Sequence, residues 1–177
     1  MKRGVAQTLW DLLLRRPVLE LNSAGIPKSK GERPMQRRYD ELVIEMKKTH
    51  GVRVVKWRNS TSGCAWEVSY GDGTVRRLIE APYPRGPMSC AVFLHEIGHH
   101  AIGLRTYRPR CLEEFHAWRW ALVEMEQRGL NVTEGVRKRR DAALRYAVGK
   151  AVRRGLKKLP SELVPYLEFQ GSCVSTL

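Results

Sequence analysis

The apolar segment from Met88 to Ile102 constrains the fold of this chain more than any other part of the sequence. Three prolines precede it and Gly103 follows it, as expected for a helix with a marked start and stop. Its apolar residues surround His95, Glu96 and His99. Such a helix must be buried, and burying two imidazoles and a carboxylate without partners would cost several kcal/mol. A satisfied polar network or a metal ion is therefore expected beside them.

The residues from His95 to His99 form the pattern H-E-x-x-H. On a helix the two histidines project from one face, at a separation that a single zinc ion can bridge. Glu96 is rotated away from that face, so we expect it to act as a general base toward water rather than as a ligand. The pattern specifies only three of five positions, and unrelated helices match it by chance.

A catalytic zinc site takes three protein ligands and keeps one position open, so the next helix should supply another. Glu113, Glu114 and His116 are the candidates there. Together with H-E-x-x-H, the run Glu114-Phe115-His116-Ala117 resembles the gluzincin arrangement of HtpX-type and ImmA/IrrE-type peptidases. Those families carry a glutamate that begins an E-x-x-A-[DN] run on a second helix.

The resemblance spans roughly residues 52 to 125 and implies one zinc ion per chain, held by His95, His99 and Glu114. It also implies that the chain hydrolyses peptide bonds, with Glu96 as its catalytic residue. One position departs from the pattern, because Trp118 stands where the families have an aspartate or asparagine. An indole cannot accept a hydrogen bond, so support for the ligands has to come from elsewhere.

The rest of the sequence predicts an α+β fold, in which a small antiparallel three-strand sheet packs on helices. Alternating β-branched and aromatic residues predict the strands, and Gly71-Asp72-Gly73 suits a tight hairpin turn between the last two. Apolar residues at three- and four-residue spacing predict the helices. The expected strands are 52–58, 64–70 and 74–80, in a meander, and the expected helices are 5–16, 35–48, 88–102, 109–129 and 136–159, with a loop at 22–34.

Positive charge is concentrated near the C-terminus of a chain with a net charge of +14. Residues 128 to 158 contain eleven Lys and Arg against Glu134 and Asp141, so 11 − 2 gives +9. A polyanion that lies along the expected helix at 136–159 would release counterions and so bind favourably, and duplex DNA is the first candidate. The residues expected to bind nucleic acid are Arg137, Lys138, Arg139, Arg140, Arg153, Arg154, Lys157 and Lys158.

The length of 177 residues suits a single domain, with N-terminal helices at 1–50, a zincin-like core at 52–129 and a basic helical region at 130–177. The N-terminal residues lack a cleavage site for export, and no segment is apolar for long enough to span a membrane. The four cysteines form no C-x-x-C pair, which favours reduced thiols. We therefore expect a cytoplasmic location.

Zinc beside a carboxylate base favours amide hydrolysis, so a zinc-dependent peptidase acting on a protein or peptide is the expected function. Tyr83 and Tyr107, in loops beside the motif helix, are candidates to stabilise an oxyanion. Because ImmA/IrrE-type peptidases cleave DNA-bound repressors, the resemblance also implies DNA or a DNA-bound regulator as a partner. The alternative is a nucleic-acid-binding protein with a structural or vestigial zinc site, and a third is a basic helix that rests on an acidic membrane or protein.

Overall fold

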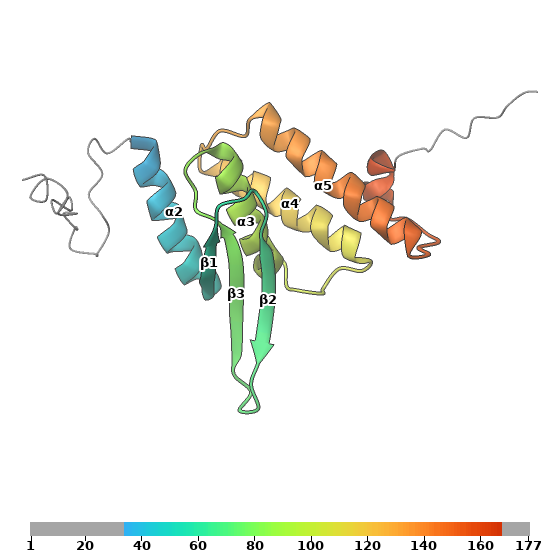
Figure 1. Cartoon of the computed structure of the whole chain (residues 1–177), viewed down its shortest axis with the longest axis horizontal. Helices are drawn as coiled ribbons and strands as arrows, with labels where there is room; N and C mark the ends of the chain where they lie inside the picture. The colour runs from blue at the N-terminus through green and yellow to red at the C-terminus, as the bar shows by residue number, and fades with distance from the viewer. Residues whose placement is uncertain (1–33, 168–177) are drawn as a thin grey trace, which may run out of the picture. The chain divides into compact units, whose positions relative to one another are not determined.

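A computed structural model describes residues 34–167, and the predicted helix at 5–16 lies outside them, as does nearly all of the predicted loop at 22–34. The described residues form an α+β fold, as predicted. Figure 1 shows the small sheet between α2 on one side and α4 and α5 on the other. The elements are α2 (Pro34–His50), β1 (Val52–Arg58), β2 (Cys64–Ser69), β3 (Val75–Pro82), α3 (Pro87–Ala101), α4 (Arg110–Gln127), α5 (Glu134–Arg153) and the 3-10 helix η1 (Ser161–Tyr166).

The three-strand sheet is mixed, and the predicted antiparallel meander is wrong. The predicted hairpin between β2 and β3 is present, with Gly73 at a φ of 83° in its turn. However, β1 pairs with β3 in parallel, so the strand order is β1-β3-β2 and residues 59–63 do not form a hairpin. The central place goes to β3, which alone of the three strands has several buried positions, including Ile79 and Ala81. This order leaves β2 as an edge strand.

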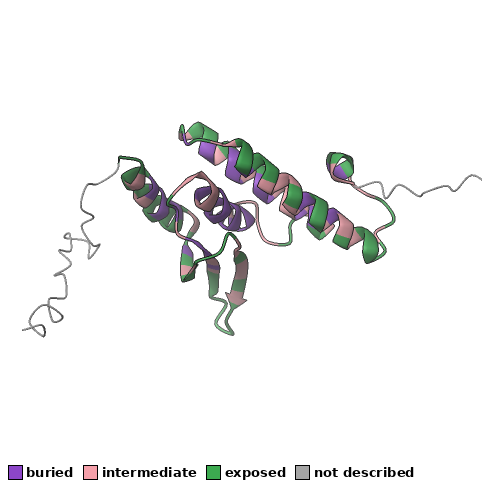
Figure 2. Cartoon of the chain, turned by 45° about the horizontal axis from the view of Figure 1, so that its top comes forward, coloured by how far each residue is buried: buried purple, intermediate pink, exposed green. Residues whose placement is uncertain are grey.

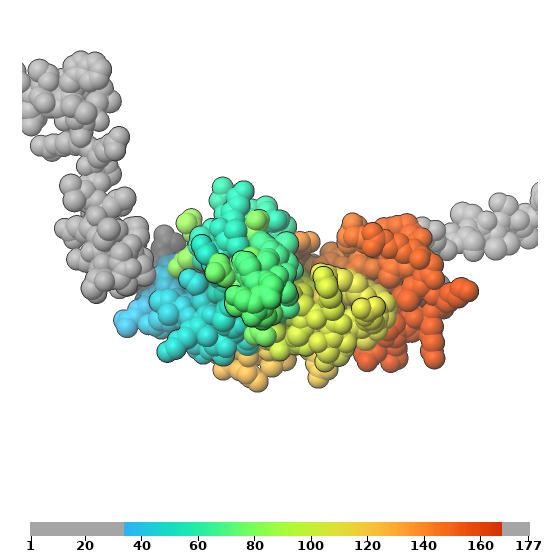
Figure 3. Space-filling model, turned by 90° about the horizontal axis from the view of Figure 1, so that it is seen from below, coloured from blue at the N-terminus to red at the C-terminus, as the bar shows by residue number. Residues whose placement is uncertain are grey.

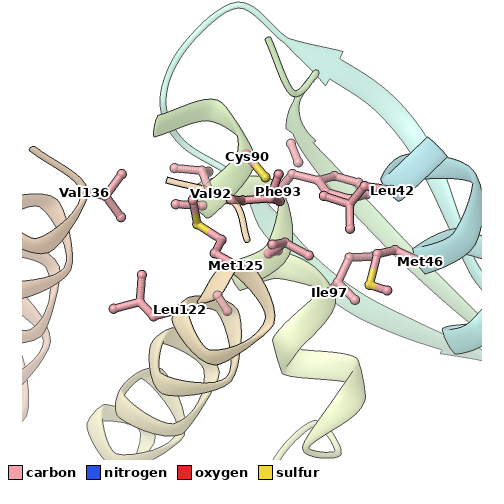
Figure 4. Close-up of a cluster of buried hydrophobic side chains, with 14 of the residues drawn as sticks. Leu42, Met46, Cys90, Val92, Phe93, Ile97, Leu122, Met125 and Val136 are labelled. Carbon is pink, nitrogen blue, oxygen red and sulfur yellow. The ribbon is translucent and has the colours of Figure 1, made fainter. Parts of the chain in front are cut away.

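Helix α3 lies at the centre of the described fold, and every residue from Cys90 to His100 is buried (Figure 2). Pro87 opens it at a position where no backbone N–H is needed, and Gly103, at a φ of 81°, follows its end. Phe93 and Ile97 join a core with residues of α2, β3 and α4 (Figure 4). The predicted burial of this helix is confirmed.

Two further helices complete the surroundings of α3. As predicted, Pro109 precedes α4 and Gly129, at a φ of 60°, follows it. Helix α5 starts at a Thr133 cap but ends at Arg153, before the predicted residue 159, because Gly155 turns the chain with a φ of 87°. Figure 3 shows the strands (teal and green) beside the start of α4 (yellow), with the end of α5 (orange) next to it. None of the helices in residues 34–167 is both long and apolar enough to cross a membrane.

Candidate metal centre

His95, His99 and Glu114 meet at one point between α3 and α4. Oε2 of Glu114 lies 3.2 Å from Nε2 of His95 and 3.6 Å from Nε2 of His99. Two ligands held about 2.1 Å from a tetrahedral zinc ion lie roughly 3.4 Å apart, so these separations match a shared zinc ion. Both histidines are buried and the glutamate is partly so. These three side chains, which the sequence predicted as ligands, could therefore hold one metal ion. They form the proposed metal-binding group.

A close contact between α3 and α4 allows Glu114 to reach the two histidines. A Cβ added at Gly98 would lie 2.8 Å from the carbonyl oxygen of Ala117 and 3.2 Å from the ring of Trp120. Ala117 is fully buried against this glycine, three residues after Glu114 and on the same side of α4. The absence of a side chain at Gly98 thus permits this close approach of the two helices.

Glu113, the alternative third ligand, lies on the other side of His99. Its Oε1 is 3.0 Å from Nδ1 of His99, and its Oε2 accepts a hydrogen bond from the backbone N–H of Arg105 at 2.9 Å. Arg105 takes a left-handed φ of 65° to present that N–H. A proton on Nδ1 shared with Glu113 leaves the lone pair of Nε2 directed at Glu114, as a metal ligand requires. The geometry therefore favours Glu114 as the ligand and Glu113 as its support.

Electrostatics also favour a cation among these groups. Burial lowers the pKa of His95, which favours the neutral imidazole that a metal ligand requires. Burial also lowers the pKa of His99, but hydrogen bonds to Glu113 and Glu114 outweigh this effect and raise it to about 9. Burial acts to raise the pKa of Glu114, yet hydrogen bonds from His95 and His99 hold it well below its usual range. Without a metal, His99 therefore retains its second proton at neutral pH.

Trp118 provides a contact that the sequence pattern did not predict. Its indole stacks on His95, with ring centroids 4.4 Å apart and planes 23° from parallel. Neither Nδ1 of His95 nor Nε1 of Trp118 has a hydrogen-bond partner among the described residues, although both atoms are buried. His95 is thus oriented by stacking and by packing within α3, whereas His99 is oriented by a carboxylate.

Glu96, the predicted base, is buried and lines the same cavity as the metal-binding group. The backbone of Gly63, in the loop between β1 and β2, lies directly against its carboxyl group, and a Cβ there would overlap it. Burial raises the pKa of Glu96 to about 7, and His99 opposes the shift. A carboxylate that titrates near neutral pH suits a general base.

The other residues considered from sequence lie away from the metal-binding group. His100, which follows His99, turns instead to the sheet, where its Nε2 donates to the carbonyl of Leu78 on β3 at 3.1 Å. His116 stacks on Tyr107 at 3.9 Å. The hydroxyl of Tyr83 donates to Asp40 at 2.6 Å. Neither tyrosine lines the cavity that contains Glu96, so the structure does not place either where it could stabilise an oxyanion.

A cavity of about 1090 Å³ opens over the metal-binding group. Residues Thr61 to Ala65 form one wall, and α5 contributes another through Ala143, Ala147 and Ala151. Nη2 of Arg139 donates to the carbonyl of Thr61 at 3.1 Å and joins the two walls. Sequence reasoning did not place α5 at the site, although alanines at four-residue spacing mark one face of that helix.

The predicted nucleic-acid-binding residues divide among three environments. Arg139 and Arg154 line the cavity. Three others form ion pairs: Arg137 with Glu126 at 3.5 Å, Lys138 with Glu134 at 3.9 Å and Arg140 with Asp141 at 2.8 Å. Among residues 34–167, no carboxylate pairs with the remaining three, which are exposed: Arg153, Lys157 and Lys158. The cluster therefore does not form one continuous free surface.

The chemistry of the site depends on a small number of contacts. Arg110 holds Oε1 of Glu114 at 3.3 Å, which leaves Oε2 for the two imidazoles. Together with Glu96 and an open cavity, this arrangement offers three ligand atoms to a metal ion, with a carboxyl group and open space beside them. No protein-family model, curated protein or solved structure matches this chain.

Proposed function

We propose that the chain is a zinc-dependent peptidase, with one zinc ion held by His95, His99 and Glu114. The observation that carries the proposal is the position of Glu114 Oε2, 3.2 and 3.6 Å from the Nε2 atoms of the two histidines. Glu113 supports the proposal, because it orients the ring of His99 as metal-binding histidines are commonly oriented. Zinc bound there would polarise a substrate carbonyl and lower the pKa of water.

Glu96, the β1–β2 loop and strand β2 have separate roles in this proposal. Glu96 takes a proton from the attacking water and passes it to the leaving amine, as its position in the cavity and its pKa near neutrality allow. Gly63 lets the backbone of the β1–β2 loop lie against that carboxyl group, which shields it from solvent. The β2 strand, at the sheet edge, supplies free backbone groups with which an extended peptide can pair.

A comparison of the parent protein with Glu96→Gln tests this function. We expect both proteins to bind one zinc ion per chain, measured by elemental analysis, because Glu96 is not a ligand. Only the parent should cleave unfolded casein, because the amide retains the shape of the carboxylate and loses its basicity. Equal cleavage by the two proteins, or a parent that binds no zinc, would show that the proposal is wrong.

Nucleic-acid binding is the second candidate, and one observation favours it. Arg145, Arg153, Lys157 and Lys158 are exposed, and none of them pairs with a carboxylate in the described part of the chain. Cations in such a position can neutralise phosphates, giving an affinity that falls steeply with salt. Replacing all four by glutamine should flatten the salt dependence of binding to a random duplex, with zinc content unchanged. No binding of the parent protein to the duplex at low salt would exclude this function.

A further inference from the structure

The charges that line the cavity are unbalanced outside the metal-binding group. Its only carboxylates among the described residues are Glu96 and Glu114, both of which belong to the proposed chemistry. Its cationic side chains are Arg110, Arg139, Lys150 and Arg154. Arg110 already pairs with Glu114, and Arg139 holds the carbonyl of Thr61. Lys150 and Arg154 have no carboxylate partner in residues 34–167, so their charges are available to a ligand.

Lys150 and Arg154 belong to the wall of the cavity that α5 forms. They stand four residues apart, at the last turn of the helix and its cap, and so on one side. The small side chains of Ala147 and Ala151 lie in the same wall and leave room beside them. The acidic residues of α5, by contrast, are Glu134 and Asp141, and neither lines the cavity. The charged residues that α5 contributes to the cavity are therefore all cationic.

We infer that the cavity selects acidic peptide segments, with carboxylate side chains of the substrate against Lys150 and Arg154. The inference rests on the proposed peptidase function and specifies its substrate class. The alanines and these two cations line the same cavity as the metal-binding group, so a peptide that extends from that group along α5 would contact both. One exposed charge pair contributes up to about fivefold in affinity, so two pairs contribute up to roughly 25-fold at low salt.

A pair of matched peptides tests this inference. Both are fluorescein-labelled decapeptides of alanine and glycine, one with four glutamates and the other with four glutamines at the same positions. Binding to the zinc-loaded Glu96→Gln protein is measured by fluorescence anisotropy at low salt, so that no cleavage intervenes. We expect the glutamate peptide to bind at least tenfold more tightly, with a preference that declines as salt rises.

Variants locate the source of the preference. Lys150→Gln combined with Arg154→Gln should remove most of it, because both cations line the cavity. The control is Arg145→Gln, which neutralises an exposed cation of the same helix that does not line the cavity and should retain the preference. Thermal unfolding of each variant shows that its fold is intact. Equal binding of the two peptides, absence of binding by the glutamate peptide, or an unchanged preference in the double variant would overturn the inference.

Two outcomes separate this inference from the proposed function. If the parent cleaves casein through Glu96 but the Glu96→Gln protein binds the two peptides equally, the peptidase stands and acidic selection falls. If the peptides bind as expected and the parent cleaves nothing, acidic recognition stands and the peptidase falls. A random DNA duplex that binds more tightly than the glutamate peptide, and loses affinity in the double variant, would also overturn the inference, because the two cations would then serve nucleic acid.

Discussion

Substituting Gly98 by alanine tests whether the close contact between α3 and α4 positions the metal-binding group. The new Cβ would lie 2.8 Å from the carbonyl oxygen of Ala117, and backbone oxygen cannot move aside as a flexible side chain can. The helices would have to separate by a few tenths of an ångström. Because Glu114 is on α4 and both histidines are on α3, that movement widens the group that holds the metal.

The expected loss of stability follows from two opposing effects. Alanine favours a helix over glycine by about 0.5–1 kcal/mol, whereas overpacking a buried contact costs about 1–3 kcal/mol. We therefore expect Gly98→Ala to lower the free energy of unfolding by about 1–2 kcal/mol, which corresponds to roughly 2–8 °C in Tm. Gly149 in α5 provides a matched control, because its Cβ would meet only the flexible Arg153 side chain at 3.3 Å. Gly149→Ala should raise the Tm.

Two measurements decide the outcome. Thermal unfolding in the presence of a chelator isolates the effect on packing, since zinc would otherwise add its own stabilisation. Zinc affinity is then measured by competition with a chromophoric chelator. We expect Gly98→Ala to weaken zinc binding and Gly149→Ala to leave it unchanged. If both variants shift the Tm in the same direction, or if Gly98→Ala binds zinc as the parent does, the interhelical contact does not set the geometry of the site.

Three further predictions follow from the contacts of the site. Glu114→Ala should lose zinc, whereas Glu113→Gln should retain it with an affinity lowered by about 10- to 100-fold, measured by chelator competition. If Glu113→Gln loses zinc and Glu114→Ala retains it, Glu113 is the ligand and Glu114 its support. Iodoacetamide should modify the exposed Cys64 far faster than Cys90, because burial raises the pKa of the Cys90 thiol to about 12. Mass spectrometry of the alkylated peptides measures the two rates. Trp118→Phe should preserve zinc affinity better than substitution of the same residue by alanine.

Local signals in the sequence predicted the parts of the fold that depend on neighbouring residues. The turn at Gly71-Asp72-Gly73 and the boundaries of α3 and α4 follow from the backbone preferences of glycine and proline. Strand pairing was predicted wrongly, because alternation shows which face of a strand is buried and not which strand lies beside it. Both edges of β3 are paired because its buried residues put it at the centre, a property of the whole sheet.

The meeting of His95, His99 and Glu114 was predictable because the spacing of these residues is a local property of two helices. His95 and His99 are one turn apart, and Glu114 shares its register with Ala117. The roles of Glu113 and Arg139 were not predictable, because each depends on a contact with a distant segment. The carboxylate of Glu113 reaches His99 on another helix, and Arg139 holds the carbonyl of Thr61. Only tertiary structure brings such pairs together.

His95 and His99 have different kinds of support, from Trp118 and from Glu113, and this difference can be measured. A ring held by a carboxylate has a fixed tautomer, as His99 has through Glu113, whereas stacking fixes only the plane of the His95 ring. Phenylalanine retains an aromatic face against His95 and removes the buried indole N–H, which has no partner among the described residues. We therefore expect the zinc affinity of Trp118→Phe to lie within a few-fold of that of the parent. Trp118→Ala should bind zinc more weakly. It should also unfold at a lower temperature, because a cavity replaces a buried indole. If alanine and phenylalanine give the same zinc affinity by chelator competition, stacking contributes nothing to the orientation of His95.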